Sequence, residues 1–154
     1  MQASLARVGA LGLALVLGHV LPGPAFAETV RLVPDDAETV ALGRDVYVAE
    51  CASCHGAALQ GQPDWRVRGE DGLLPAPPHD ETGHTWHHDD GTLFTLTKHG
   101  LAGILGEGAP PSGMPAYEGV LTDEQIVAVL SYIVSTWPAE VREMHAEINA
   151  RADR

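Results

Sequence analysis

Cysteine, lysine and aromatic residues are scarce in this chain. Its 154 residues include two cysteines, Cys51 and Cys54, and one lysine, Lys98, and aromatic residues make up 5%. Disulfide bridges cannot form a framework here, and a ring of lysines cannot guide a partner to the surface. With so few aromatic side chains, a chain of this size needs another large apolar group to complete its core.

Basic residues are also outnumbered. Lys and Arg total 9 against 21 Asp and Glu, a net charge of −12 at pH 7. Arg7 is the only charged residue among the first 27, so residues 28–154 carry 8 basic and 21 acidic side chains, a net charge of −13. This excess of negative charge argues against nucleic acid and anionic membrane surfaces as partners.

Residues 1–27 are typical of a signal peptide. A positive charge at Arg7 precedes the apolar residues 8–20, and residues 25–27 form an Ala-Phe-Ala cleavage site. Thirteen apolar residues are too few to span a bilayer, which disfavours the alternative of a retained membrane anchor. We expect cleavage after Ala27, a mature chain that begins at Glu28, and export to the periplasm without stable membrane insertion.

Cys51, Cys54 and His55 form a C-x-x-C-H run, which is typical of covalent haem c attachment. Each thiol can add to one haem vinyl group, and the adjacent imidazole can bind the iron. A thioredoxin-like redox pair would need a βαβ context, and a zinc site would need further ligands at metal spacing. Neither context is present in the sequence, so we expect one covalently attached haem c per chain.

Residues 113–117, Gly-Met-Pro-Ala-Tyr, follow the haem motif and precede an apolar helical pattern. Together these features resemble a class I monohaem cytochrome c over residues 40–137. The resemblance implies an all-α fold of a few helices around one haem, with a cytochrome domain at 28–138 and a C-terminal helical extension at 139–154. It also implies a monomeric single-electron carrier, not an enzyme, that serves redox partner proteins such as an oxidase or a dehydrogenase.

Met114 is the candidate for the second axial ligand of the haem iron, opposite His55. A thioether ligand raises the reduction potential, whereas the alternative ligand His99 would lower it. Two filled axial positions would leave no open site for a substrate, which disfavours a haem peroxidase. The resemblance further implies that a proline carbonyl accepts a hydrogen bond from the His55 ring and fixes its tautomer. Three prolines are candidates: Pro75, Pro77 and Pro78.

Hydrophobic periodicity predicts two helices. The resemblance to class I cytochromes c implies that these two helices cross each other. The first begins at Asp35 or Asp36 and continues to residue 50, and the second begins at a capping box of Thr122 and Gln125. Glycine inside a helix costs about 1 kcal/mol relative to alanine. A close helix crossing would explain Gly43, with aromatic contacts from Tyr47 and Tyr132; the alternative is a tolerated surface glycine.

Two further helices are predicted. Residues 92–99 have a partly apolar surface and end at Gly100, a typical C-terminal cap. Residues 139–151 form a mostly charged amphipathic pattern that could pack back, extend into solvent or bind a partner. We favour packing back through Val141, Met144 and Ile148, with His145 exposed to solvent.

Residues 79–90 contain four histidines among several carboxylates. His84, His87 and His88 are candidate ligands of a copper or zinc ion, which would make the protein a metal-handling or redox-sensing haem protein. Histidine-rich composition alone is weak evidence. We therefore favour a polar loop at the haem edge, in which Trp86 or a histidine hydrogen-bonds a haem propionate.

Overall fold

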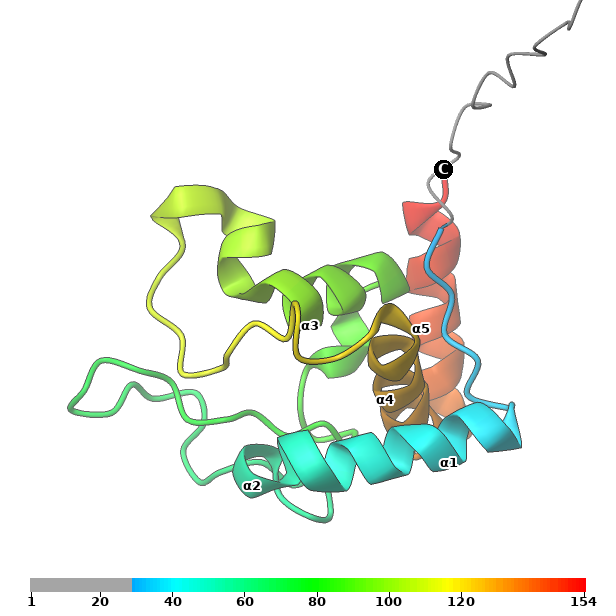
Figure 1. The fold of residues 1–154 in the computed structure, drawn as a ribbon, viewed down its shortest axis with the longest axis horizontal. Helices are drawn as coiled ribbons and strands as arrows, with labels where there is room; N and C mark the ends of the chain where they lie inside the picture. Colours follow the sequence, from blue (N-terminus) through cyan, green and yellow to red (C-terminus); the bar gives the residue numbers. More distant parts are fainter. Residues whose placement is uncertain (1–28) are drawn as a thin grey trace, which may run out of the picture.

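The computed structural model describes residues 29–154 of the protein (Figure 1). The predicted signal peptide at residues 1–27 lies outside the described residues. Residues 29–154 contain five α-helices and no named β-strand: α1 (Ala37–Val46), α2 (Ala52–His55), α3 (Asp90–Leu105), α4 (Asp123–Ser135) and α5 (Ala139–Ala152). A π-helical turn at Tyr47–Cys51 joins α1 to α2, and short 3-10 turns lie at Thr85–His87 and Gly106–Gly108. The all-α prediction is confirmed.

Helices α1 and α4 make the most extensive helix–helix contact in the described part. At their crossing, a Cβ atom on Gly43 would lie 1.9 Å from the carbonyl oxygen of Ala128. The rings of Tyr47 and Tyr132 pack beside this point with centroids 5.5 Å apart. The crossing at Gly43 is therefore confirmed, and the surface-glycine alternative is wrong.

Helix α4 forms the centre of the core. It begins at the predicted capping box, in which the Thr122 hydroxyl and the Gln125 side chain each bond the other's backbone N–H. Its apolar residues recur at helical spacing, so one broad face is buried between α1 and α3. The buried residues of this face are Ile126, Ala128, Val129, Leu130, Ile133 and Val134.

Helix α3 is interrupted where its sequence predicted an end. The Asp89 carboxylate accepts a hydrogen bond from the backbone N–H of Thr92 and caps the helix. Gly100 adopts a φ of 70°, which is costly for a residue with a Cβ. A further short helical segment follows as far as Leu105. Gly56, at the end of α2, has a similar φ of 83°.

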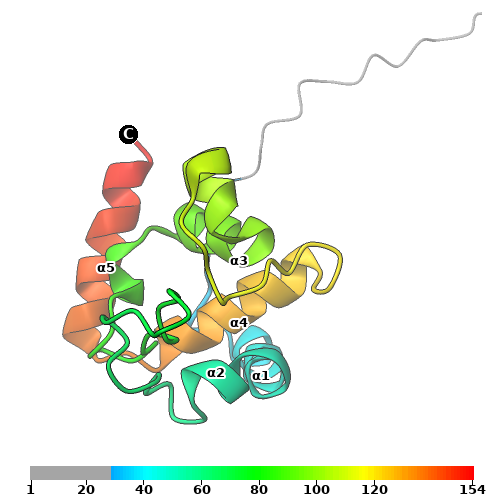
Figure 2. The same ribbon diagram turned by 90° about the vertical axis from the view of Figure 1, so that its left-hand side faces the viewer.

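Helix α5 packs back on the domain and lies beside the turn at Thr85–His87 (Figure 2). Val141 contacts the core and Ile148 is half-buried, as predicted. The predictions for the two residues between them are wrong: His145 is 4% exposed, whereas Met144 is 41% exposed. The buried side of α5 follows an i, i+4, i+7 spacing, which brings position 145 inward instead of position 144.

None of the helices within residues 29–154 is long and apolar enough to cross a membrane.

Candidate haem site

A cavity of about 550 Å³ lies between helices α3 and α4 and two long loops, residues 56–84 and 106–121. Figure 1 shows both loops reaching out on the same side of the helices. The cavity has the size and the largely apolar walls typical of a cofactor site. Its helical walls come from Leu93, Leu96, Leu101, Val129, Leu130 and Ile133, and its loop walls include Leu73, Leu74, Pro110 and Pro111.

Cys51 and Cys54 line this cavity, and both are free thiols. Burial, together with the nearby Glu50 and Cys54, raises the pKa of the Cys51 thiol to about 11. Cys54 is exposed. The one-turn helix α2 ends at Gly56, whose carbonyl accepts a hydrogen bond from the buried Tyr47 hydroxyl at 2.9 Å. The structure therefore leaves both thiols available for thioether bonds at the cavity wall.

His55 is buried and also lines the cavity. Its Nδ1 donates a hydrogen bond to the carbonyl oxygen of Pro77 at 2.8 Å, so Pro77 is the supporting proline among the three candidates. Burial lowers the pKa of His55, although the bond to Pro77 opposes the shift. A neutral ring with its proton on Nδ1 leaves Nε2 free to bind iron.

The ring of His79 stacks on the ring of His55, with centroids 3.9 Å apart and an interplanar angle of 23°. The His79 Nδ1 pairs with the Thr85 hydroxyl at 2.8 Å, and its backbone carbonyl accepts a hydrogen bond from the Trp137 indole at 2.7 Å. Burial, together with the neighbouring His55 and His84, lowers the pKa of His79 to about 3. From the sequence, His79 is expected only as part of a polar tract, and no motif in the sequence predicts this contact.

Met114 is half-buried and lines the same cavity as His55. Its loop is tied down at one end, because the Tyr117 backbone N–H donates to the Thr97 carbonyl at 3.1 Å and the Tyr117 hydroxyl donates to the Glu50 carbonyl at 2.9 Å. Beside Met114, the Ser112 hydroxyl accepts a hydrogen bond from the Met114 N–H at 3.1 Å. These contacts support the side chain of Met114 at the cavity wall.

His99, the alternative second ligand, does not line the cavity. Its Nδ1 lies 3.3 Å from a carboxylate oxygen of Glu118, and its side chain is 39% exposed. The structure therefore gives His99 a surface ion pair and keeps it apart from His55.

The histidine-rich tract does not assemble a second metal site. No group of three or more His, Cys, Asp or Glu side chains within residues 29–154 is arranged to hold a metal ion. His84 and His88 line the haem cavity, whereas His87 does not. The His84 ring stacks on Trp65 with centroids 5.2 Å apart and meets His88 edge-on at 5.6 Å.

Trp86 does not line the cavity. Its ring packs on His87 with centroids 3.7 Å apart, and its indole N–H is buried without a hydrogen-bond partner among the described residues. A buried N–H of this kind usually has a partner. Contact between Trp86 and a haem propionate stays a prediction.

Comparison with known proteins shows the family to which this chain belongs. The sequence profile of the cytochrome c family matches residues 40–137. The CcoP subunit of a cbb3-type cytochrome c oxidase from Azospirillum sp. (strain B510) is 30% identical over 100 residues, or 62% of this chain. The chain spans about 30% of the length of that subunit. No solved structure matches significantly. The chain therefore belongs to the cytochrome c family, whose covalently bound haem c transfers electrons.

Proposed function

We propose that this cytochrome carries single electrons between redox partner proteins outside the cytoplasm, with His55 and Met114 as the axial ligands of the haem iron. The observation that carries this proposal is that both side chains line the cavity that also holds Cys51 and Cys54. The haem supplies an iron that alternates between the ferrous and ferric states. We infer no substrate chemistry, because two side-chain ligands would fill both axial positions.

The surrounding residues support this role. The Pro77 carbonyl holds the His55 ring in one tautomer, and the stacked His79 ring restricts its rotation. A neutral thioether from Met114 favours ferrous iron, and apolar walls that exclude water disfavour the extra charge of ferric iron. We therefore expect a higher reduction potential than ligation by two histidines would give.

The ligation is tested by replacing each methionine of the described part in turn. Met114→Ala should abolish the weak sulfur-to-iron charge-transfer band of the oxidised protein and lower its potential. Met144→Ala is the matched control, because Met144 is exposed on α5, and it should change neither property. Absence of this band from the wild type, or an unaltered spectrum and potential in Met114→Ala, would refute this ligation.

We also propose that residues 1–27 direct export and that the mature protein consists of a cytochrome domain, residues 28–138, and an extension, residues 139–154. Mass spectrometry of the protein from the periplasmic fraction should give the mass of residues 28–154 plus one haem. Acid-acetone extraction should leave the haem on the polypeptide, because thioether bonds survive denaturation. A mass that includes residues 1–27 would contradict the cleavage, and release of free haem would contradict the attachment.

The partner should dock through a basic surface. Residues 28–154 carry a net charge of −13, and the amine of Lys98, the only lysine, already pairs with Asp123 at 2.7 Å. The similarity to an oxidase subunit makes a terminal oxidase the first acceptor to test. Electron-transfer rates to a basic partner should fall as salt rises, because salt screens the attraction. Rates that rise with salt toward that partner would contradict the proposal.

A further inference from the structure

Helix α5 lies beyond residues 40–137, which match the family, yet it contacts the segment that carries the cavity-lining histidines. We infer that α5 is a working part of the haem site: His145 and Asn149 position residues 84–90 so that His84 and His88 close the rim of the haem cavity. This inference rests on the cavity being the haem site, but not on which side chains bind the iron.

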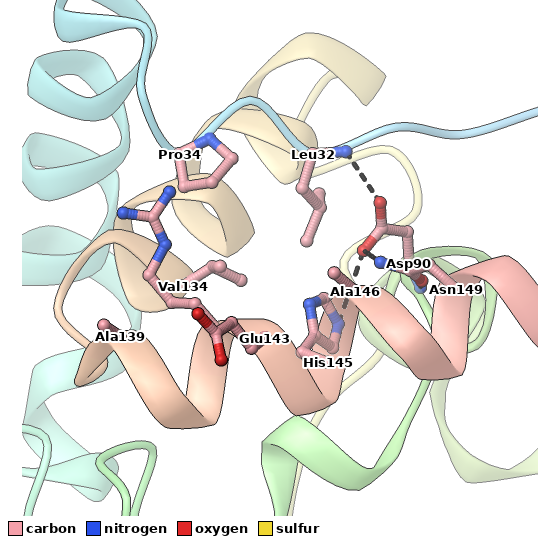
Figure 3. Close-up of a pocket in the computed structure, with 10 residues that line it drawn as sticks. Leu32, Pro34, Asp90, Val134, Ala139, Glu143, His145, Ala146 and Asn149 are labelled. Carbon is pink, nitrogen blue, oxygen red and sulfur yellow. Dashed lines mark hydrogen bonds and ion pairs between the residues drawn. The ribbon is translucent and has the colours of Figure 1, made fainter.

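Asp90 is the point where three segments meet, as Figure 3 shows. Its carboxylate accepts hydrogen bonds from the Leu32 backbone N–H at 2.9 Å and from the Asn149 side-chain amide at 3.0 Å. The Asp90 backbone N–H in turn donates to the Asn149 side-chain oxygen at 2.8 Å. Asn149 therefore makes two hydrogen bonds to one residue and holds the first turn of α3 against α5.

His145 makes the second link to Asp90, from one turn earlier on α5. Its Nε2 lies 3.4 Å from the nearer carboxylate oxygen of Asp90. The ring also meets Trp137 edge-on with centroids 5.2 Å apart. His145 is 4% exposed, so these polar contacts are shielded from competing water.

The other end of the histidine-rich segment is held by Trp137, which lies between α4 and α5. The Trp137 indole donates to the His79 carbonyl at 2.7 Å, and the Thr85 hydroxyl pairs with the His79 ring at 2.8 Å. Between these two ends, Thr85 and the two histidines His84 and His88 line the cavity. The segment is thus anchored by Trp137 at its start and by α5 at its end.

Polar contacts at Asp90 add to the apolar packing that holds α5 in place. An open pocket of about 420 Å³ lies between α5 and residues Leu32 and Pro34, with the core residue Val134 at its wall (Figure 3). Beside this pocket, the hydrogen bonds of Asn149 and the contact of His145 with Asp90 contribute to the attachment of α5. Their loss should loosen residues 84–90, admit water to the haem cavity and favour ferric iron.

Asn149→Leu tests the inference, because leucine has a similar size but can neither donate to nor accept from Asp90. In the purified protein with its haem attached, amide hydrogen exchange should become faster at residues 84–92 while α1 and α4 stay protected. The reduction potential should fall in the same variant. Asn149→Asp is a milder second variant that places like charges beside each other, and it should shift both readouts in the same direction. Met144→Ala on the exposed side of α5 should change neither.

Three outcomes would overturn the inference. Unchanged exchange at residues 84–92 in both Asn149 variants would show that α5 does not hold the segment. Faster exchange throughout α1 and α4 would show a general loss of stability instead of a local one. Faster local exchange with an unchanged potential would show that the segment does not affect the cofactor. If the charge-transfer band is retained in both Met114→Ala and Met144→Ala, Met114 is not the ligand. That result would refute the proposed ligation and leave this inference unaffected.

Discussion

The crossing of α1 and α4 predicts that Gly43→Ala lowers the stability of the protein. Steric overlap at the crossing and the higher helix propensity of alanine change the stability in opposite directions. In a solvent-exposed helix position, Gly43→Ala would stabilise the protein by about 1 kcal/mol, because alanine has the higher helix propensity. At the observed crossing, the new Cβ would lie 1.9 Å from the Ala128 carbonyl oxygen and 2.5 Å from its carbon. These atoms are backbone, so no side-chain rotation can relieve the overlap.

The size of the destabilisation follows from how far the two helices must move apart to remove this overlap. Real Cβ atoms essentially never approach another heavy atom closer than 3.0 Å, so a contact of 1.9 Å requires the two helices to move apart by about 1 Å. That movement would loosen the contact between Tyr47 and Tyr132 beside the crossing. Overpacking of a dense core costs about 1–3 kcal/mol or more. A backbone clash belongs at the upper end, which leaves a net loss of about 2 kcal/mol after the gain in helix propensity.

Thermal unfolding of the protein with its haem attached provides the assay. A loss of about 2 kcal/mol should lower the midpoint by roughly 8 °C for a domain of this size. Gly108→Ala is the matched control, since nothing lies within 4 Å of a Cβ at Gly108, and its midpoint should stay nearly unchanged. A midpoint for Gly43→Ala at or above that of the wild type would refute the close crossing.

Three further predictions concern hydrogen bonds near the ends of helices. Tyr47→Phe removes the hydroxyl that donates to the Gly56 carbonyl and should cost about 1 kcal/mol in denaturant unfolding; an unchanged midpoint would contradict a contribution from this bond. Thr122→Ala removes the capping box of α4 and should also cost about 1 kcal/mol, whereas Thr122→Ser should restore most of it. Hydrogen bonds from Thr39 lower the pKa of Asp36, so the stability that this carboxylate contributes is present above its ordinary pKa of 3.8 and is lost as the pH falls through the lower folded value. Asp36→Asn keeps the cap but should lack this acid-dependent loss, and parallel pH profiles of unfolding free energy for the two proteins would contradict the assignment.

The covalent attachment motif and the helices that frame it could be predicted from the sequence. Cys51, Cys54 and His55 lie within five consecutive residues, so the geometry of one helical turn brings them together without contacts from the rest of the chain. Gly43 and the capping box at Thr122 were also readable, because each depends on a local preference that few residues satisfy. The crossing of α1 and α4 at Gly43 was implied by the resemblance to class I cytochromes c, and the structure confirms it.

The residues that reach the site from distant parts of the chain could not be predicted from the sequence, because their contacts depend on the path of the folded chain. Three neighbouring prolines offer the same carbonyl group, and the path of the loop selected Pro77 for His55. The stacking of His79 depends on that path as well. The burial of His145 was not predictable, because a histidine on a charged helix carries no periodic signal of its own. Its burial follows from the angle at which α5 returns to the domain, which depends on contacts far apart in sequence and on no local preference of its residues.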